Sequence, residues 1–129
     1  MPTAVVRFRI DFAEHSSVGP GKIGLLEAIR DAGSLSQGAR NIGMSYRRAW
    51  LLVESLKQSF REPVTVASTG GKEGGGMLVT DFGDALIRHY RELERDFATL
   101  AERRLHPIIA TVIPHSKSLA RTSVRTKLE

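Results

Sequence analysis

The fold is decided by Gly33-Ser-Leu-Ser-Gln-Gly-Ala-Arg-Asn-Ile-Gly-Met-Ser-Tyr-Arg-Arg-Ala-Trp50. This stretch predicts two short helices joined by a tight turn at Gly43, because glycine readily adopts the backbone conformation of such a turn. Ser45 is well suited to cap the second helix, which places Tyr46, Arg47 and Arg48 in its first turn. Two short helices arranged in this way are typical of a helix-turn-helix, whose second helix enters a DNA major groove.

The segments before this motif predict a strand, a loop and a helix. Val5–Phe12 alternates apolar and polar residues for most of its length, the period of a half-buried strand. Ser16–Gly21 is rich in serine and glycine and is expected to be a loop. Lys22–Ala32 carries apolar residues at helical spacing, and Gly33 is well placed to end that helix.

The motif itself supplies the rest of a small helical core. Ser34 is the expected N-cap of the short helix, whose predicted inward face consists of Leu35, Ala39 and Ile42. The next helix has an apolar stripe at helical spacing, formed by Ala49, Leu52, Val53, Leu56 and Phe60. Trp50 lies beside this stripe, so a position at the edge of the core is expected for it.

A glycine-rich hairpin is predicted directly after the third helix. Pro63 stops that helix, and Val64–Ala67 and Met77–Thr80 are the two expected strands. Between them lies the glycine-rich loop Thr69–Gly76, so the segment predicts a β-hairpin. A hairpin that follows a recognition helix is the wing of a winged helix, and residues 1–80 are therefore expected to form one winged helix-turn-helix domain.

A long last helix is expected over residues 81–106, with Thr80 as its N-cap. Its apolar residues recur at spacings of four and three, close to a heptad seam; they are Phe82, Leu86, Tyr90, Leu93, Phe97 and Leu100. We interpret it as a dimerisation helix, and packing against its own domain is the alternative. His106-Pro107 closes it, Ile108–Ile113 could form a strand, and residues 107–129 are expected to be a flexible basic tail. The fold class is therefore mainly α with a small β wing.

Positive charge is concentrated in two segments. The 129-residue chain has a formal net charge of +5. Residues 34–61 contain five basic residues against Glu54, a net charge of +4, and residues 107–129 contain four against Glu129, a net charge of +3. An excess of positive charge on a candidate reading element indicates an anionic partner, and a solubilising surface is the alternative.

The chain has no cysteine, so disulfides and thiolate metal sites are excluded, which fits a reducing cytoplasm. No apolar run reaches the length of a bilayer span. The first residues, Met1-Pro-Thr-Ala, lack the features of a secretory signal. We therefore expect a cytoplasmic protein without a membrane partner.

The candidate DNA-binding residues come from three elements. In the second helix of the motif, Arg47 and Arg48 can donate to guanine or phosphate, and Leu51 can touch a thymine methyl group. In the preceding helix, Ser36 and Gln37 can contact phosphate, with simple helix capping as the alternative. Lys72 in the glycine-rich loop can neutralise a phosphate or enter a minor groove. The full set is Ser36, Gln37, Ser45, Tyr46, Arg47, Arg48, Leu51 and Lys72.

Enzymatic chemistry has little support. The glycine-rich loop lacks the P-loop order, because Lys72 precedes the last glycines and a strand follows. The four histidines, His15, His89, His106 and His115, have no partner at the spacing of a metal site. No nucleophile elbow is present. We therefore expect neither an enzyme, nor a cofactor, nor a metal site.

These residues resemble the N-terminal domain of ModE, the molybdate-responsive bacterial repressor, and more distantly the LysR-type DNA-binding domain. The resemblance extends from about Gly19 to Leu100. Its carriers are Leu26-Glu-Ala-Ile29, Gly33-Ser-Leu-Ser-Gln-Gly-Ala-Arg40, Ser45-Tyr-Arg-Arg-Ala-Trp50, Thr69-Gly-Gly-Lys-Glu-Gly-Gly-Gly76, Leu78-Val-Thr80 and Phe82-Gly83.

The resemblance implies a winged-helix homodimer, joined through the long helix and bound to a two-fold related operator on double-stranded DNA. It implies that Tyr46, Arg47, Arg48 and Lys72 read the DNA. The repressor carries molybdate-binding domains after its dimer helix, whereas only a short basic tail follows here, so we do not expect molybdate or another oxyanion as an effector. The leading hypothesis is a transcriptional regulator; a non-specific or architectural DNA-binding protein and a winged-helix protein–protein adaptor are the alternatives.

Overall fold

The computed structural model describes residues 4–69 and 75–114. Its secondary structure is mainly helical, at 58%, with small antiparallel hairpins, which confirms the mainly α class and is compatible with a winged helix. The chain divides into two compact units: Arg9–Tyr90, and Met1–Phe8 together with Arg91–Glu129.

The first unit opens with a hairpin of β1 (Ile10–Ala13) and β2 (Ser16–Val18). The two strands are antiparallel, with an irregular register between Asp11 and Ala13. The expected strand over Val5–Phe12 therefore has the wrong bounds, because β1 starts at Ile10 and ends at Ala13. The expected loop over Ser16–Gly21 is wrong, because it contains β2 and the start of α1. The turn depends on His15, which has a φ of 67°; histidine is one of the few non-glycine residues that tolerate this conformation.

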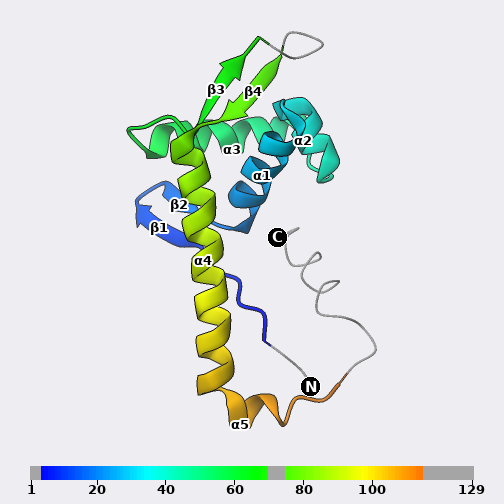
Figure 1. Cartoon of the computed structure of the whole chain (residues 1–129), viewed down its shortest axis with the longest axis vertical. Helices are drawn as coiled ribbons and strands as arrows, with labels where there is room; N and C mark the ends of the chain where they lie inside the picture. The colour runs from blue at the N-terminus through cyan, green and yellow to red at the C-terminus, as the bar shows by residue number, and fades with distance from the viewer. Residues whose placement is uncertain (1–3, 70–74, 115–129) are drawn as a thin grey trace. The chain divides into compact units, whose positions relative to one another are not determined.

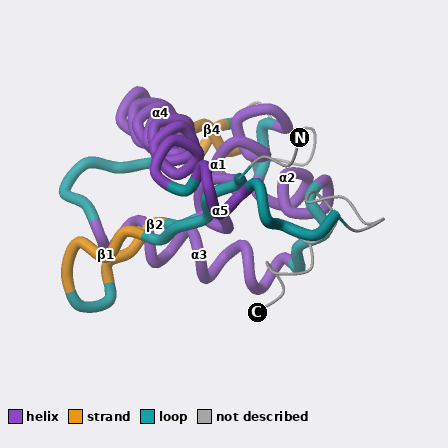
Figure 2. The backbone as a smooth tube through the Cα atoms, turned by 90° about the horizontal axis from the view of Figure 1, so that it is seen from below, coloured by secondary structure: helices purple, strands orange, loops and turns teal. Residues whose placement is uncertain are grey.

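Three helices form the centre of this unit: α1 (Pro20–Ala32), α2 (Leu35–Asn41) and α3 (Tyr46–Ser59). β2 contacts both α1 and α3, and Figure 2 shows the β1–β2 hairpin beside α3. The predicted inward position of Ile42 is wrong, because α2 ends before it and its side chain is 44% exposed. The helices share a buried cluster of apolar side chains, made of Leu25, Ile29, Leu35, Ala39, Ala49 and Val53.

The predicted caps fix the turns between these helices. Gly33 has a φ of 82° and donates its N–H to the carbonyl of Ile29, which ends α1. The Ser34 hydroxyl accepts the N–H of Gln37 at 3.1 Å, and the Ser45 hydroxyl accepts the N–H of Arg48 at 3.1 Å. Both bonds satisfy backbone donors that the first turn of a helix leaves free. Gly43 has a φ of 68°, as the tight turn requires.

The predicted second hairpin is present as β3 (Thr65–Ser68) and β4 (Gly76–Val79), paired antiparallel. Figure 1 shows it extending from the three-helix cluster. The loop-side end of β4 is joined to the turn between α1 and α2, because the Met77 N–H donates to the Gly33 carbonyl at 2.9 Å and Ser34 bridges Gly76.

Helix α4 (Asp81–Arg104) begins as predicted at Thr80, whose hydroxyl accepts the N–H of Gly83 at 3.0 Å. The first turns of the helix pack within the first unit, where Ile87 and Tyr90 are buried. The ring of Phe82 also contacts Phe60, with centroids 5.4 Å apart. Phe82 and Tyr90, two residues of the predicted heptad seam, therefore pack within the first unit.

The second unit contains the rest of α4 and the short helix α5 (His106–Ile109). α4 ends at Arg104 rather than at residue 106, because Pro107 has no N–H to continue the helical ladder. The predicted strand over Ile108–Ile113 is wrong. The N–H groups of Ile108 and Ile109 donate to the Leu105 carbonyl at 2.9 and 2.8 Å, which closes a helical turn. No strand pairs with this segment among the described residues.

Candidate nucleic-acid interface

The N-terminal turn of α3 is exposed and positively charged. Ser45 is committed to capping through its bond to the N–H of Arg48, and the next three residues all lie on the surface. Tyr46 is 57% exposed. The start of a helix carries a partial positive charge, to which the two arginines add full charges. This turn therefore attracts anions.

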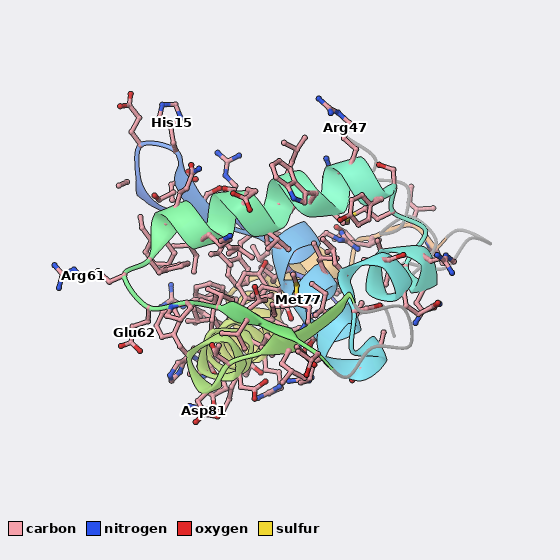
Figure 3. All side chains as sticks on the ribbon, turned by 90° about the horizontal axis from the view of Figure 1, so that it is seen from above. His15, Arg47, Arg61, Glu62, Met77 and Asp81 are labelled. Carbon is pink, nitrogen blue, oxygen red and sulfur yellow. The ribbon has the colours of Figure 1, made fainter. Side chains whose placement is uncertain are left out.

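The two arginines of this turn differ in direction. Arg47 points away from the body of the domain (Figure 3). The guanidinium of Arg48 instead lies beside the start of α1, where its Nη2 atom is 4.0 Å from the position that a Cβ on Gly21 would take. Neither arginine forms an ion pair with another residue of the described ranges, so both charges remain available to a ligand.

The outer face of α3 continues beyond the first turn. Leu51 is 48% exposed, as expected for a residue off the apolar stripe. Trp50 is 46% exposed, more than a position at the edge of the core implies. A shallow hollow of about 480 Å³ adjoins this face, lined by His15, Trp50, Leu51, Glu54, Ser55 and Gln58.

Of the residues that line this hollow, only Leu51 was among the sequence-based candidates. The polar residues His15, Glu54 and Gln58 were not. Glu54 and Gln58 follow Arg47 at helical spacing, so the period of the helix could have identified them. His15 comes from the turn between β1 and β2, and its position could not be inferred without knowing that this hairpin lies against α3.

The exposed side of α2 carries a connected polar network. Arg40 donates to the Gln37 side-chain oxygen at 3.1 Å and to the Ser36 hydroxyl at 3.2 Å. The Gln37 amide in turn donates to Asn41 at 2.7 Å. The side chain that caps the helix is that of Ser34. The side chains of Ser36 and Gln37 do not cap it but accept hydrogen bonds from Arg40. Arg40 is a cation in the last turn of α2 that the sequence-based candidates omitted.

Lys22 connects the elements that support α3. Its ammonium group donates to the Ser17 carbonyl of β2 at 2.7 Å and to the Ser55 hydroxyl of α3 at 2.9 Å. Burial lowers the pKa of Lys22, and the positive charge of Arg9 lowers it further. The angle between α1 and α3 therefore depends in part on a desolvated cation.

The candidate site of the β3–β4 hairpin is only partly visible. Lys72 and most of the glycine-rich loop lie outside the described residues, as does the tail from residue 115. Within the described ranges, no group of histidine and acidic residues could hold a metal ion. In the same ranges, no helix is both long and apolar enough to span a bilayer.

Comparison with known proteins identifies relatives among molybdenum-related bacterial proteins. The DNA-binding transcriptional dual regulator ModE of Escherichia coli K12 is 33% identical over 112 residues, covering 84% of this chain and 43% of the relative. The molybdenum transport protein ModE of Azotobacter vinelandii is 31% identical over 99 residues, covering 77% and 37%. The molybdenum-pterin-binding protein MopB of Rhodobacter capsulatus is 40% identical over 83 residues, covering 64% and 31%. No family model matches the chain.

The matches cover the N-terminal region of these relatives, which confirms the resemblance to a ModE-type DNA-binding domain. The chain spans less than half the length of each of these relatives. The relatives are transcriptional regulators and molybdenum-related binding proteins rather than enzymes.

Proposed function

We propose that this chain binds double-stranded DNA in a sequence-specific manner, as the winged helix-turn-helix of a ModE-type transcriptional regulator. The observation that carries the proposal is the first turn of α3, where exposed Arg47 and Arg48 follow the Ser45 cap. The similarity to transcriptional regulators named ModE supports the same reading.

In this proposal α3 lies in the major groove and Arg47 is the base-reading arginine. Because Arg47 points away from the domain, its guanidinium can reach the O6 and N7 atoms of guanine. One such bidentate contact contributes roughly 1–3 kcal/mol of discrimination. Tyr46 and Leu51, exposed on the same helix, contribute contacts to the sugar and to a thymine methyl group. Arg48 is directed toward α1 and contacts a phosphate instead.

Phosphate contacts set the register of the complex. Ser36 and Gln37 hold Arg40 on the surface of α2, and this trio is placed to contact the DNA backbone beside the groove. Lys72, in the loop of the β3–β4 wing, neutralises a further phosphate. Each neutralised phosphate releases counterions, so the affinity falls as the salt concentration rises.

The proposed regulator is a homodimer joined through the second unit. Several large apolar side chains of this unit are exposed, as a dimer contact would require: Phe97, Leu100, Leu105, Ile108, Val112 and Ile113. A two-fold dimer reads two half-sites whose centres lie one helical turn, roughly 34 Å, or a multiple of it apart. Molybdate sensing is not part of this proposal.

Selection of bound duplexes from a random pool, followed by a salt titration, tests the proposal. We expect an enriched, two-fold related sequence that binds at least roughly 10³-fold more tightly than random DNA. Equal affinity for selected and random duplexes, with the same salt dependence, would instead establish non-specific binding. If no duplex binds even at low salt, the domain is a protein–protein adaptor.

A further inference from the structure

The outer face of α3 carries a single row of side chains beyond Arg47. A helix turns by roughly 100° per residue, so Leu51, Glu54 and Gln58 lie within about 40° of Arg47 on the wheel. The opposite side of the wheel holds the buried residues Ala49, Val53 and Leu56. If Arg47 faces DNA, the rest of this row faces it too.

The C-terminal end of this row borders a surface hollow. Glu54 and Gln58 line the hollow beside the β1–β2 turn, together with His15. Figure 3 shows the labelled His15 and Arg47 pointing away from the domain on the same side of α3. The hollow is therefore a place where the edge of a base pair can approach the helix.

Glu54 is an unusual residue for such a face. It is the only acidic residue between Ser34 and Arg61, and phosphates repel its carboxylate. Its Oε2 atom accepts from the Lys57 ammonium at 3.3 Å, and the side chain remains 30% exposed. The pair with Lys57 orients the carboxylate and leaves Oε1 as an acceptor. In the major groove, the amino group N4 of cytosine is the donor that a carboxylate selects.

We propose that Glu54 is a specificity-determining residue that accepts a hydrogen bond from the N4 amino group of cytosine in a C·G pair. This inference rests on the proposed function. Glu54 follows Arg47 by seven positions, which is roughly 10 Å along the helix axis. The C·G pair is therefore a different base pair from the one whose guanine Arg47 reads.

Duplex selection with the full chain and three variants tests this inference. For the wild type we expect the cytosine to be enriched, and its replacement to weaken binding roughly 5- to 100-fold. We expect the Glu54→Ala protein to lose the preference for this cytosine and to retain the preference for the guanine read by Arg47. Glu54→Gln shifts the preference toward adenine, because the glutamine amide both donates to N7 and accepts from N6 of adenine. Glu62→Gln is the matched control, since it removes an exposed negative charge next to the end of α3 and leaves the selected sequence unchanged.

Two outcomes would overturn the inference while the proposed function stands. One is a Glu54→Ala protein that still selects the same cytosine. The other is a Glu54→Ala protein that binds all duplexes more tightly by the same factor as Glu62→Gln, since Glu54 would then act only through its charge. A wild-type protein without any sequence preference would reject sequence-specific regulation itself.

Discussion

Adjacent residues of the same type have different surroundings at the start of α3. Hydrophobic periodicity predicted the helix and its buried side, because both depend on residues close in the sequence. It could not predict that Arg47 and Arg48 point in different directions, because the direction of Arg48 depends on the position of Gly21 in the fold. Likewise, the cap of α2 followed from local sequence, whereas the contact of Arg40 with Ser36 and Gln37 required side-chain positions.

The difference between the arginines gives a prediction. Arg47→Ala is expected to abolish discrimination at one base pair, at a cost of roughly 1–3 kcal/mol on the selected sequence and much less on random DNA. Arg48→Ala is expected to weaken binding to all sequences by the same factor. It should also reduce the slope of log affinity against log salt concentration by about 1. Fluorescence anisotropy on selected and mismatched duplexes at several salt concentrations measures both effects. The same loss of discrimination in both variants would contradict the assignment.

Two glycines in helices provide a matched test of packing. A Cβ on Gly83 would lie 2.5 Å from the Val64 carbonyl oxygen and 2.6 Å from Val79 Cγ1, whereas a Cβ on Gly24 meets no atom within 4 Å. Gly83→Ala is therefore expected to lower the free energy of unfolding by roughly 1–3 kcal/mol. Gly24→Ala is expected to raise it by up to about 1 kcal/mol, because alanine favours the helix. Urea denaturation of both variants checks the opposite signs. A Gly83→Ala protein of unchanged stability would show that α4 can move away from Val64 and Val79.

The desolvated Lys22 predicts a pH-dependent contribution to stability. Lys22→Met removes two hydrogen bonds from a charged donor, and we expect it to lower the free energy of unfolding by roughly 1–3 kcal/mol at neutral pH.

The sign of the pH dependence follows from the lowered pKa of Lys22. Between this pKa and the ordinary value of about 10.4, the unfolded chain binds more protons than the folded one. The Lys22 contribution to the free energy of unfolding therefore rises with pH in that window. Denaturation at neutral and alkaline pH measures the difference between wild type and Lys22→Met, with Ser55→Ala as the control that keeps the ammonium group. A difference that shrinks as the pH rises would contradict this account.

At the scale of elements, local signals predicted more than long-range pairing did. The helices α1, α2 and α3 and the β3–β4 hairpin followed from caps, glycines and apolar spacing. The β1–β2 hairpin was not predicted, because β2 lies in a serine- and glycine-rich segment that indicates a loop and because β2 packs against α1 and α3. Residues 108–113 were expected to form a strand, yet no partner strand pairs with this segment in the described part of the chain.

The wing contributes affinity rather than specificity in the proposed function. Lys72→Ala is expected to weaken binding to selected and random duplexes by the same factor and to reduce the salt slope by about 1. Electrophoretic mobility shifts across a salt series measure this. Arg61→Ala, which also removes one positive charge from an exposed residue, is the control. A loss confined to one base pair would show that Lys72 reads sequence in a groove.

At the scale of the whole molecule, the sequence predicted a long last helix, and part of its apolar face packs within the first unit. Ile87 and Tyr90 are buried within the first unit. In the second unit the rings of Phe8 and Phe97 pack at 4.9 Å, yet Phe97 remains 38% exposed. A heptad pattern cannot distinguish contacts within the domain from contacts with a second copy, because both require apolar residues at the same spacing.

The proposed dimer can be tested with the exposed residues of the second unit. The double variant Leu100→Asp, Ile108→Asp is expected to sediment as a 14.2 kDa monomer, whereas we expect the wild type to sediment at twice this mass. Buried carboxylates would be too costly at an apolar contact. Affinity for the two-fold operator should fall by roughly 10²-fold or more, while binding to one half-site remains.

Ile42→Asp provides the control for this experiment, because it places the same charge at an exposed apolar residue of the first unit. Its sedimentation should match that of the wild type. A double variant that still sediments as a dimer would show that the second unit is not the contact.

The bond from the Met77 amide to the Gly33 carbonyl makes one backbone hydrogen a reporter on two elements. That hydrogen is shielded from solvent exchange only while β4 is folded and the chain reversal ahead of α2 is intact. Its rate of deuterium uptake therefore follows the joint opening of both. Slower uptake at Met77 when an operator is added would reveal that DNA stiffens this junction as a single block, without any label on the nucleic acid.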